Sequence, residues 1–470
     1  MSFLKGVFMF DDKIYAKRRQ LLKKRVSSGL ILFLGNEDSP MNYPANAYPF
    51  RQDSSFLYFF GLDSPGLSAV VDVDENKDLL FGNDIDIEDI IWMGYLPTVK
   101  QRAVRVGVKH TAPLVALEGL LQKAAQKGRR IHYLPPYRPE TFLALERLLG
   151  IKPAKAKANS SPELIKAVVA QRSVKSWEEI EQIEIALTTT YKMYITAMHM
   201  AQPGVYEKDI AGRIDGIAIA HGGATAFPTI LTKDGQILHN HDHGNKLKPG
   251  NLLVVDAGAE SPLHYAADIT RTIPVGGKFS TRQKEIYDIV LAAQEGAIRA
   301  IRPGIKYKEI HLRTARVIAS GLKDAGLMKG NTEEAVRLGA HALFFPHGLG
   351  HMLGLDVHEM ENLGENHVGY NHSVQRSEQF GLAYLRLAKE LRPGYVLTVE
   401  PGIYFIPALI DKWKKEKKFT DFINYSKLEK YRDFGGIRIE DDVLVTNVGH
   451  RVLGRPIPKK PAQVEETVRI

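Results

Sequence analysis

The sequence has no cysteine among its 470 residues. This absence excludes disulfide bonds, thiolate zinc sites, iron–sulfur clusters and a cysteine nucleophile. Any metal must therefore be held by histidine and carboxylate side chains. A chain without cysteine also fits the cytoplasm, where we expect this protein to act.

Long apolar runs are absent as well. No run approaches the ~20 apolar residues of a membrane span. The first segment, Met1 to Gln20, interrupts its apolar stretch with Lys5 and then carries Asp11 and Asp12, so it has no signal-peptide core. We therefore expect no membrane partner.

The excess of one charge sign is small. The 63 Lys and Arg residues exceed the 54 Asp and Glu residues by a net charge of +9, and most of that excess is not gathered in one place. Two basic clusters stand out, one from Lys152 to Lys157 and one from Lys412 to Lys418. The second is typical of the solvated face of a short helix, and we expect no nucleic-acid partner.

The length predicts two or three domains with ordinary globular composition. Apolar runs at residues 29–34, 67–73 and 79–81 predict buried strands, the last two forming a hairpin, and helical spacing follows at residues 142–149. The first 150 residues therefore predict an α/β domain. Because residues 151–162 lack an apolar period, we place the domains at 1–165 and 166–470.

The second part of the chain contains an internal repeat. Capping boxes at residues 176–179 and 280–283 each open a long predicted helix, and Pro-Gly pairs at 203–204 and 303–304 end them. In each half a Leu-Lys/Arg-Pro-Gly segment then leads a strand into a carboxylate, Asp256 or Glu400. Two like halves predict a pseudo-twofold domain whose carboxylates face each other across a cleft.

Four acids end or interrupt strand-like apolar runs, and His351 lies in a glycine-rich segment nearby. The acids are Asp256, Asp268, Glu400 and Glu440. Taken singly, each would more often be a turn former or an ion-pair partner, and His351 a core residue. Converging carboxylates repel, so one must be neutralised by a raised pKa or all need cations, and two divalent ions would balance four acids. The glycines beside His351 would let the backbone approach a metal closely.

These motifs resemble the pita-bread metallopeptidase family, which includes creatinase, aminopeptidase P and prolidase. The resemblance covers nearly the whole chain and rests on residues 50–61, 237–239, 256–258, 268–272, 347–351, 398–402 and 436–440. It implies an α/β (α+β) fold, with a small N-terminal α/β domain followed by a pseudo-twofold pita-bread catalytic domain.

The resemblance also implies the site residues. Two divalent ions would be bound by Asp256, Asp268, His351, Glu400 and Glu440, with Mn²⁺ as the first choice and Co²⁺, Zn²⁺ or Fe²⁺ as alternatives. The implied catalytic residues are His239, His358 and Glu400, and the implied substrate-binding residues are His347, Arg386, Arg438 and Tyr404. The interval from Asp256 to Asp268 is one residue longer than the family typically has, which we attribute to the turn near Pro262.

Of the alternating histidines His239, His241 and His243, we expect only the first to be functional, because Asp242, Gly244 and Asn245 predict a turn. His239 and His358 would flank the scissile carbonyl and stabilise the oxyanion formed by a metal-activated hydroxide. Glu400 would move a proton to the leaving nitrogen, and His347 would line the subsite for proline.

The implied activity is that of a Xaa-Pro aminopeptidase, which acts on peptides with proline at the second position. Residues 50–61 favour this activity, whereas residues 381–386 and an insert at 407–433 favour the alternative, a Xaa-Pro dipeptidase (prolidase) in which Arg386 holds the dipeptide carboxylate. The family also implies a homodimer or homotetramer in which the N-terminal domain covers a neighbour's cleft.

A second class of function is a non-catalytic peptide-binding protein of the same fold, or a metal-free hydrolase. Relatives of that kind lose metal ligands, whereas all five are present here. The sequence also has no Gly-x-Ser-x-Gly elbow, which argues against a serine hydrolase.

Overall fold

The computed structural model describes residues 9–469 and divides into two compact units. Unit 1 runs up to Arg172 and includes Met360–His367, and unit 2 comprises Ser173–Glu359 with the residues from Val368 onward. The domain boundary predicted at residues 165 and 166 lies within helix α8 (Pro162–Arg172) and stays a prediction.

Unit 1 is built on a mixed sheet of five strands in the order β4-β3-β2-β1-β5. Its strands are β1 (Leu30–Leu34), β2 (Ser68–Asp72), β3 (Lys77–Phe81), β4 (His110–Ala112) and β5 (Ile131–His132). The predicted hairpin is confirmed, since β2 and β3 pair antiparallel with Ser68 opposite Phe81. The helices are α1 (Asp12–Lys23), α2 (Ser54–Phe60), α3 (Ile87–Met93), α4 (Val99–Val104), α5 (Val115–Gln126), α6 (Pro139–Leu149), α7 (Pro153–Ala156) and α8.

Helix α2 explains the motif at residues 50–61 in structural terms. The Asp53 carboxylate caps the helix by accepting a hydrogen bond of 2.9 Å from the Phe56 amide. Gly61 ends it in the left-handed conformation, with φ of 62°, and a side chain there would lie 2.2 Å from the Tyr15 ring. Every residue of α2 is buried, so this motif forms part of the core of unit 1.

Unit 2 contains the two predicted long helices. They are α9 (Trp177–Met200) and α11 (Thr281–Ala300), and both capping boxes, at Ser176 and Ser280, are formed. The other helices are α10 (Glu207–Ala220), α12 (Tyr307–Asp324), α13 (Thr332–Leu338), α14 (Glu365–Val368, at the border with unit 1), α15 (Pro407–Lys415), α16 (Tyr425–Leu428) and α17 (Pro461–Arg469). Its strands are β6 (Ile230–Thr232), β7 (Leu252–Ala257), β8 (Ile269–Pro274), β9 (Val396–Val399), β10 (Gly402–Tyr404), β11 (Gly436–Arg438), β12 (Asp441–Val445) and β13 (His450–Val452).

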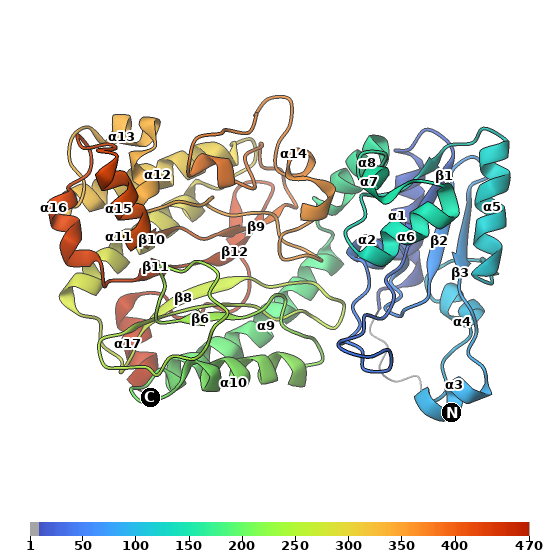
Figure 1. Ribbon diagram of the computed structural model, residues 1–470, viewed down its shortest axis with the longest axis horizontal. Coiled ribbons are helices and arrows are strands. Elements are labelled where there is room, and N and C mark those ends of the chain that lie inside the picture. The colour runs from blue at the N-terminus through green and yellow to red at the C-terminus, as the bar shows by residue number, and fades with distance from the viewer. Residues whose placement is uncertain (1–8, 470) are drawn as a thin grey trace. The chain divides into compact units, whose positions relative to one another are not determined.

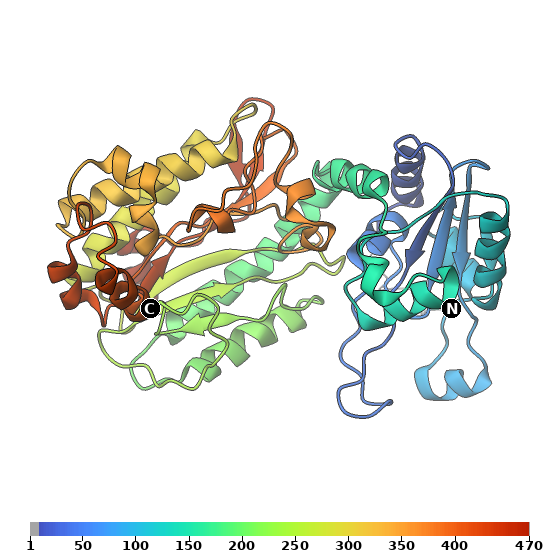
Figure 2. The ribbon, with the colours of Figure 1, turned by 45° about the horizontal axis from the view of Figure 1, so that its top comes forward.

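The internal repeat is confirmed by equivalent contacts in the two halves. The Gly204 amide donates to the Leu247 carbonyl at 2.9 Å, and the Gly304 amide donates to the Leu391 carbonyl at 3.0 Å. Strands of both halves lie in the middle of the unit, with α9 and α10 on one outer side and α11 and α12 on the other (Figures 1 and 2). Unit 2 therefore has the pseudo-twofold arrangement that the repeat predicts.

The strand registers bring the four acids toward one place. In the antiparallel pair β7–β8, Asp256 lies opposite Thr270, so Asp256 and Asp268 extend from the same face. In the pair β9–β12, Val399 lies opposite Asp441, and Glu400 and Glu440 directly flank that pair. Four acids that are far apart in the sequence are thus carried on neighbouring strand ends.

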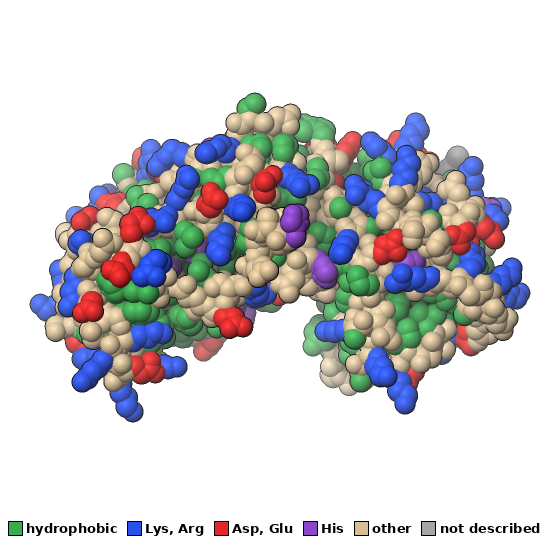
Figure 3. Space-filling model, turned by 90° about the horizontal axis from the view of Figure 1, so that it is seen from above, with side chains coloured by type: hydrophobic (Ala, Val, Ile, Leu, Met, Phe, Trp, Pro, Cys, Tyr) green, Lys and Arg blue, Asp and Glu red, His purple; other side chains and the backbone are tan. Residues whose placement is uncertain are grey.

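Surface charge is mixed. On the face drawn in Figure 3, lysine and arginine side chains are interspersed with aspartate and glutamate. Within residues 9–469, no helix combines the length and apolar character needed to cross a membrane.

Candidate active site

A cavity of about 800 Å³ opens in unit 2 at the ends of the strands that carry the acids. This volume lies within the usual range for small-molecule and peptide sites. All five predicted metal ligands line it, as do His239, His347, His358, Arg386 and Arg438. The cavity therefore brings together every predicted site residue except Tyr404.

Three of the predicted ligands form a compact buried cluster. One ligand atom each from Asp268, His351 and Glu440 lies within 4.8 Å of the other two. His351 Nε2 lies 3.3 Å from Asp268 Oδ2 and 3.7 Å from Glu400 Oε1. A fourth ligand is thus adjacent to the cluster, and its side chain is 19% exposed, toward the cavity.

The protonation state of His351 suits the binding of a metal better than it suits an ion pair. Its Nδ1 lies 3.0 Å from the Met352 carbonyl oxygen, which can only accept, so Nδ1 carries the proton. Burial also lowers the pKa of His351, which keeps the ring neutral. The Nε2 lone pair therefore faces carboxylate oxygens, an arrangement that a bound cation would stabilise.

Asp256 makes a different contact. Its Oδ2 accepts a hydrogen bond of 2.6 Å from Arg438 Nη2, within a largely buried ion pair. The Arg438 guanidinium also donates from Nη1 to the Tyr404 hydroxyl at 2.9 Å and from Nε to Thr270 Oγ1 at 3.1 Å. Arg438 thus supplies one positive charge to the group of four acids.

The acids are strongly perturbed by burial and by one another. Burial and the neighbouring Asp256 raise the pKa of Asp268 well above its usual range, and burial and Asp268 do the same to the pKa of Glu440. Burial also raises the pKa of Glu400, although His351 opposes it. One oxygen each of Asp256, Asp268 and Glu440 is buried without a hydrogen-bond partner among the described residues. These oxygens fit the coordination of divalent cations.

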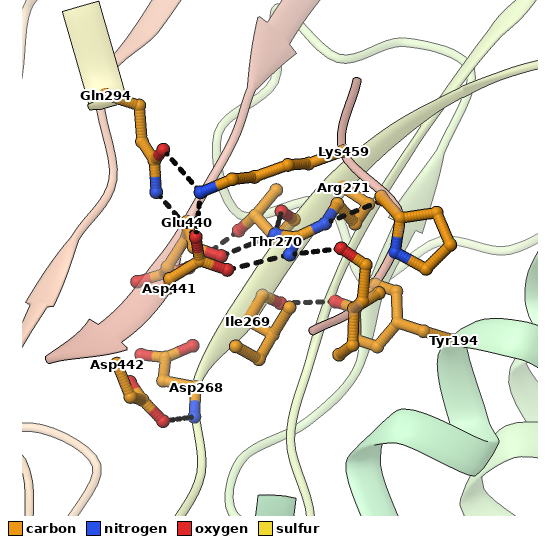
Figure 4. Close-up of polar contacts among 12 residues, drawn as sticks. Tyr194, Asp268, Ile269, Thr270, Arg271, Gln294, Glu440, Asp441, Asp442 and Lys459 are labelled. Atoms are coloured by element: carbon orange, nitrogen blue, oxygen red, sulfur yellow. Dashed lines mark hydrogen bonds and ion pairs between the residues drawn. The ribbon is translucent and has the colours of Figure 1, made fainter. Parts of the chain in front are cut away.

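A second layer of polar residues holds the ligands in place (Figure 4). The Thr270 hydroxyl donates to Glu440 Oε2 at 2.7 Å, and the Asp268 amide donates to Asp442 Oδ2 at 3.0 Å. Fully buried Arg271 donates to the Glu440 carbonyl at 2.6 Å and to Asp441 Oδ1 at 2.7 Å. Because Arg271 lies on β8 and the acids lie beside β12, these contacts fix the two strands to each other.

The histidines of the cavity are also oriented by their neighbours. His347 Nδ1 lies 2.8 Å from the Gly348 carbonyl and its Nε2 lies 2.8 Å from the Tyr404 hydroxyl, so the hydroxyl donates to Nε2. Burial and Arg438 lower the pKa of His347 to about 3, and they also lower the pKa of His239. The His358 ring packs edge-on against His351, with ring centroids 4.4 Å apart. His347 and His358 are therefore held on the cavity wall.

Sequence and structure comparisons agree with this geometry. A family profile described as metallopeptidase family M24 matches residues 181–447, and one described as the N-terminal domain of aminopeptidase P matches residues 15–132. The chain belongs to metallopeptidase family M24. It is therefore an enzyme, a hydrolase of the metallopeptidase class.

Relatives of this M24 peptidase match it over nearly their whole length. A Xaa-Pro aminopeptidase of Escherichia coli is 30% identical over 96% of each chain. A human Xaa-Pro dipeptidase is 29% identical over 96% of this chain and 92% of its own. Among solved structures, Zn-substituted E. coli aminopeptidase P in complex with product is 29% identical with a TM-score of 0.81, covering 98% of this chain and 99% of its own. An aminopeptidase of Pseudomonas aeruginosa is 28% identical with a TM-score of 0.80, covering 98% of each chain.

The structure adds two features of the M24 site to the sequence-based expectations. Gly350 and Gly348 are required by protein packing, since a side chain at Gly350 would lie 2.1 Å from the Thr398 carbonyl and one at Gly348 would lie 2.9 Å from the Leu385 Cα. Tyr404 is fully buried behind the wall, where its hydroxyl links Arg438 to His347. It orients these two residues and does not line the cavity.

Several wall residues of the M24 site were not predicted. They are His241, Phe227, Pro228, Ile230, Leu238, Val357, Phe380, Tyr384, Ile406, Ala408, Leu409 and Lys412. The repeated Phe-Pro pair at 227–228 and 345–346 was a signal that could have identified the first apolar residues. Lys412, interpreted as part of a solvated helix face, is exposed and also lines the cavity.

Proposed function

We propose that this protein is a Xaa-Pro aminopeptidase, which hydrolyses the bond between an N-terminal residue and a following proline. The observation that carries the proposal is the buried cluster of Asp268, His351 and Glu440, in which a neutral imidazole nitrogen faces acids at the wall of a large cavity. The names of the bacterial relatives give the same activity.

Two divalent cations would be held by the residues whose carboxylate oxygens are buried without a hydrogen-bond partner among the described residues, together with the adjacent predicted ligands. These are Asp256, Asp268, His351, Glu400 and Glu440. When bound, such ions polarise a substrate carbonyl and lower the pKa of water, and we propose Mn²⁺ as the physiological ion, with Co²⁺, Zn²⁺ and Fe²⁺ as alternatives.

The chain's own side chains have distinct roles in this proposal. Glu400 reaches the cavity, and burial raises its pKa, which suits a residue that takes a proton and passes it to the leaving nitrogen. His239 and His358 would donate hydrogen bonds to the scissile carbonyl oxygen as it gains charge. His347, packed against Phe345 with ring centroids 5.0 Å apart, would line the proline subsite. A proline nitrogen in a peptide bond has no N–H, so an apolar wall suits it.

The second candidate is a Xaa-Pro dipeptidase. Arg386 lines the cavity and could bind the carboxylate of a dipeptide, and the human relative carries this activity in its name. The two candidates differ in the length of peptide that they accept.

The test is to load the protein with Mn²⁺ and incubate it separately with a Xaa-Pro dipeptide and a Xaa-Pro-Yaa-Yaa tetrapeptide, measuring the released amino acid. We expect hydrolysis of the tetrapeptide and its loss after chelation. Hydrolysis of the dipeptide alone would replace the aminopeptidase by the dipeptidase, and an Arg386→Met variant should then lose most of its activity. Absence of hydrolysis of both peptides by a metal-loaded protein would contradict the proposed function.

We also propose that the protein acts in the cytoplasm and forms a homodimer or homotetramer. The absence of cysteine supports the compartment. Light scattering coupled to size exclusion would test the oligomer, since a monomer at micromolar concentration would contradict it.

A further inference from the structure

Helix α15 forms part of the cavity wall in unit 2. Ala408, Leu409 and Lys412 line the cavity from this helix. On the adjoining side, Ile410 and Trp413 are buried, at 1% and 3% exposure. The Trp413 ring packs against Phe380 with centroids 5.8 Å apart, which fixes the rotation of the helix. Because Ala408 and Lys412 are one turn apart, both face the cavity.

The Lys412 side chain is exposed and makes no hydrogen bond or ion pair with any part of the chain that the structure describes. Three other cations around α15 have partners. Lys414 Nζ lies 2.7 Å from Glu429 Oε1, Arg432 Nη1 lies 2.7 Å from Asp411 Oδ1, and Lys418 Nζ lies 4.3 Å from the centre of the Trp413 ring. Lys412 thus presents an uncompensated positive charge to the cavity.

The charges of the cavity are unevenly distributed. Its four acids all belong to the predicted metal site, Arg438 is already paired with Asp256, and Arg386 acts electrostatically on Glu400. An aminopeptidase substrate has its ammonium group on the residue before the scissile bond and its carboxylates beyond it. A lysine on the wall would repel the ammonium group and attract a carboxylate. Lys412 is therefore suited to the side of the cavity that receives the residues after proline.

We propose that Lys412 is a specificity-determining residue that binds a carboxylate of the substrate beyond proline, so that the enzyme prefers peptides with an acidic group there. The carboxylate can be the chain terminus of a short peptide or the side chain of a glutamate or aspartate. The inference rests on the proposed function, since it concerns how that same cavity selects among Xaa-Pro peptides.

The experiment compares kcat/KM for two matched pairs of peptides. The first pair is Ala-Pro-Ala-Ala and its C-terminal amide, and the second is Ala-Pro-Glu-Ala amide and Ala-Pro-Gln-Ala amide. Ratios within a pair do not depend on the active fraction of a preparation. We expect the wild type to favour the carboxylate member of at least one pair by about threefold, the strength of an exposed ion pair.

Lys412→Met should abolish this preference and Lys412→Glu should reverse it. Lys415→Met, which changes an exposed lysine of the same helix that does not line the cavity, should leave it unchanged. If the Lys412 variants change the preference only in the first pair, the bound carboxylate is the chain terminus. If they change it only in the second pair, the bound carboxylate is the glutamate side chain. Equal hydrolysis within both pairs by the wild type, or a preference that survives Lys412→Glu, would overturn the inference while the aminopeptidase activity stands. A metal-loaded wild type that hydrolyses none of the four peptides would overturn the proposed function and the inference with it.

Discussion

At the residue scale, unit 2 contains two histidines whose burial has a thermodynamic cost in acid. His311 and His341 are fully buried, their ring centroids are 6.5 Å apart, and none of their ring nitrogens has a hydrogen-bond partner among the described residues. Burial, helped by the nearby His341, lowers the pKa of His311 to about 3, and burial lowers the pKa of His341 to about 4. In the unfolded chain, the pKa of each histidine returns to about 6.5.

These two histidines should make the fold sensitive to mild acid. The pKa of each histidine is lower in the folded state than in the unfolded state. Their contribution to the free energy of unfolding is therefore fully present above pH ~6.5 and is lost as the pH falls toward 4. Between pH 7 and pH 5, each should reduce the free energy of unfolding by about 2 kcal/mol. Urea unfolding of a His341→Leu variant at both pH values should therefore show a smaller loss than the wild type. The matched control is His199→Gln, which changes an exposed histidine of α9 and should leave the pH dependence as in the wild type. An equal pH dependence of the free energy of unfolding in wild type and His341→Leu would contradict the argument.

At the element scale, the link between β8 and β12 depends on a buried ion pair. Arg271 Nη2 lies 2.7 Å from Asp441 Oδ1, and Lys459 Nζ lies 2.6 Å from Asp441 Oδ2. Removing one partner of a buried pair leaves an uncompensated charge, whereas replacing both with apolar residues is far less costly.

We expect Arg271→Met to reduce the free energy of unfolding by about 3–5 kcal/mol, measured by urea denaturation. The double variant Arg271→Met/Asp441→Leu should recover part of this loss, because the remaining Lys459 side chain is 21% exposed and can turn to water. If the double variant were as unstable as the two single variants combined, the pair would not be the source of the effect.

The elements also show which parts of the structure the sequence could predict. The helix starts at Ser176 and Ser280 were predictable because a capping box is local, and the two halves were predictable because they repeat. The contact between Arg271 and Asp441 was not, since these residues are 170 positions apart and no local pattern pairs them.

The candidate site likewise contains residues that the sequence could predict and residues that it could not. The four acids and the histidine of the predicted metal site stand at strand ends and in motifs, so they could be selected from the sequence. The cavity-facing orientation of Lys412 could not, because it depends on how Trp413 packs against Phe380. Tyr404 was predicted to bind substrate, and only the structure shows that it lies behind His347.

At the scale of the whole molecule, metal binding and stability should be coupled through pH. The pKa values of Asp268 and Glu440 are raised in the fold, mainly by burial, so these groups favour folding below their usual pKa and oppose it as the pH rises through the folded value. Metal binding requires their deprotonated forms and removes their repulsion.

We therefore expect Mn²⁺ to raise the melting temperature of chelator-treated protein, and the increment to grow from pH 5 to pH 8. At a concentration 100 times its Kd, the ion should add about 2.7 kcal/mol of stability. Differential scanning fluorimetry measures the increment, and Asp268→Asn should remove it while stabilising the metal-free protein at high pH. An increment that stays constant with pH would show that these carboxyls do not carry the coupling.

The pairing of α9 with α17 has a consequence for how the protein is made. These helices pack together, and the Gln202 side chain, two residues beyond the end of α9, donates a hydrogen bond of 2.7 Å to the Val468 carbonyl, 266 residues later. On the ribosome, the sheet of unit 1 is synthesised in full before α9 emerges, so it can fold during translation. The peptidase unit must wait for α17, which means that the nascent chain carries an unfinished and inactive active site until α17 has been synthesised.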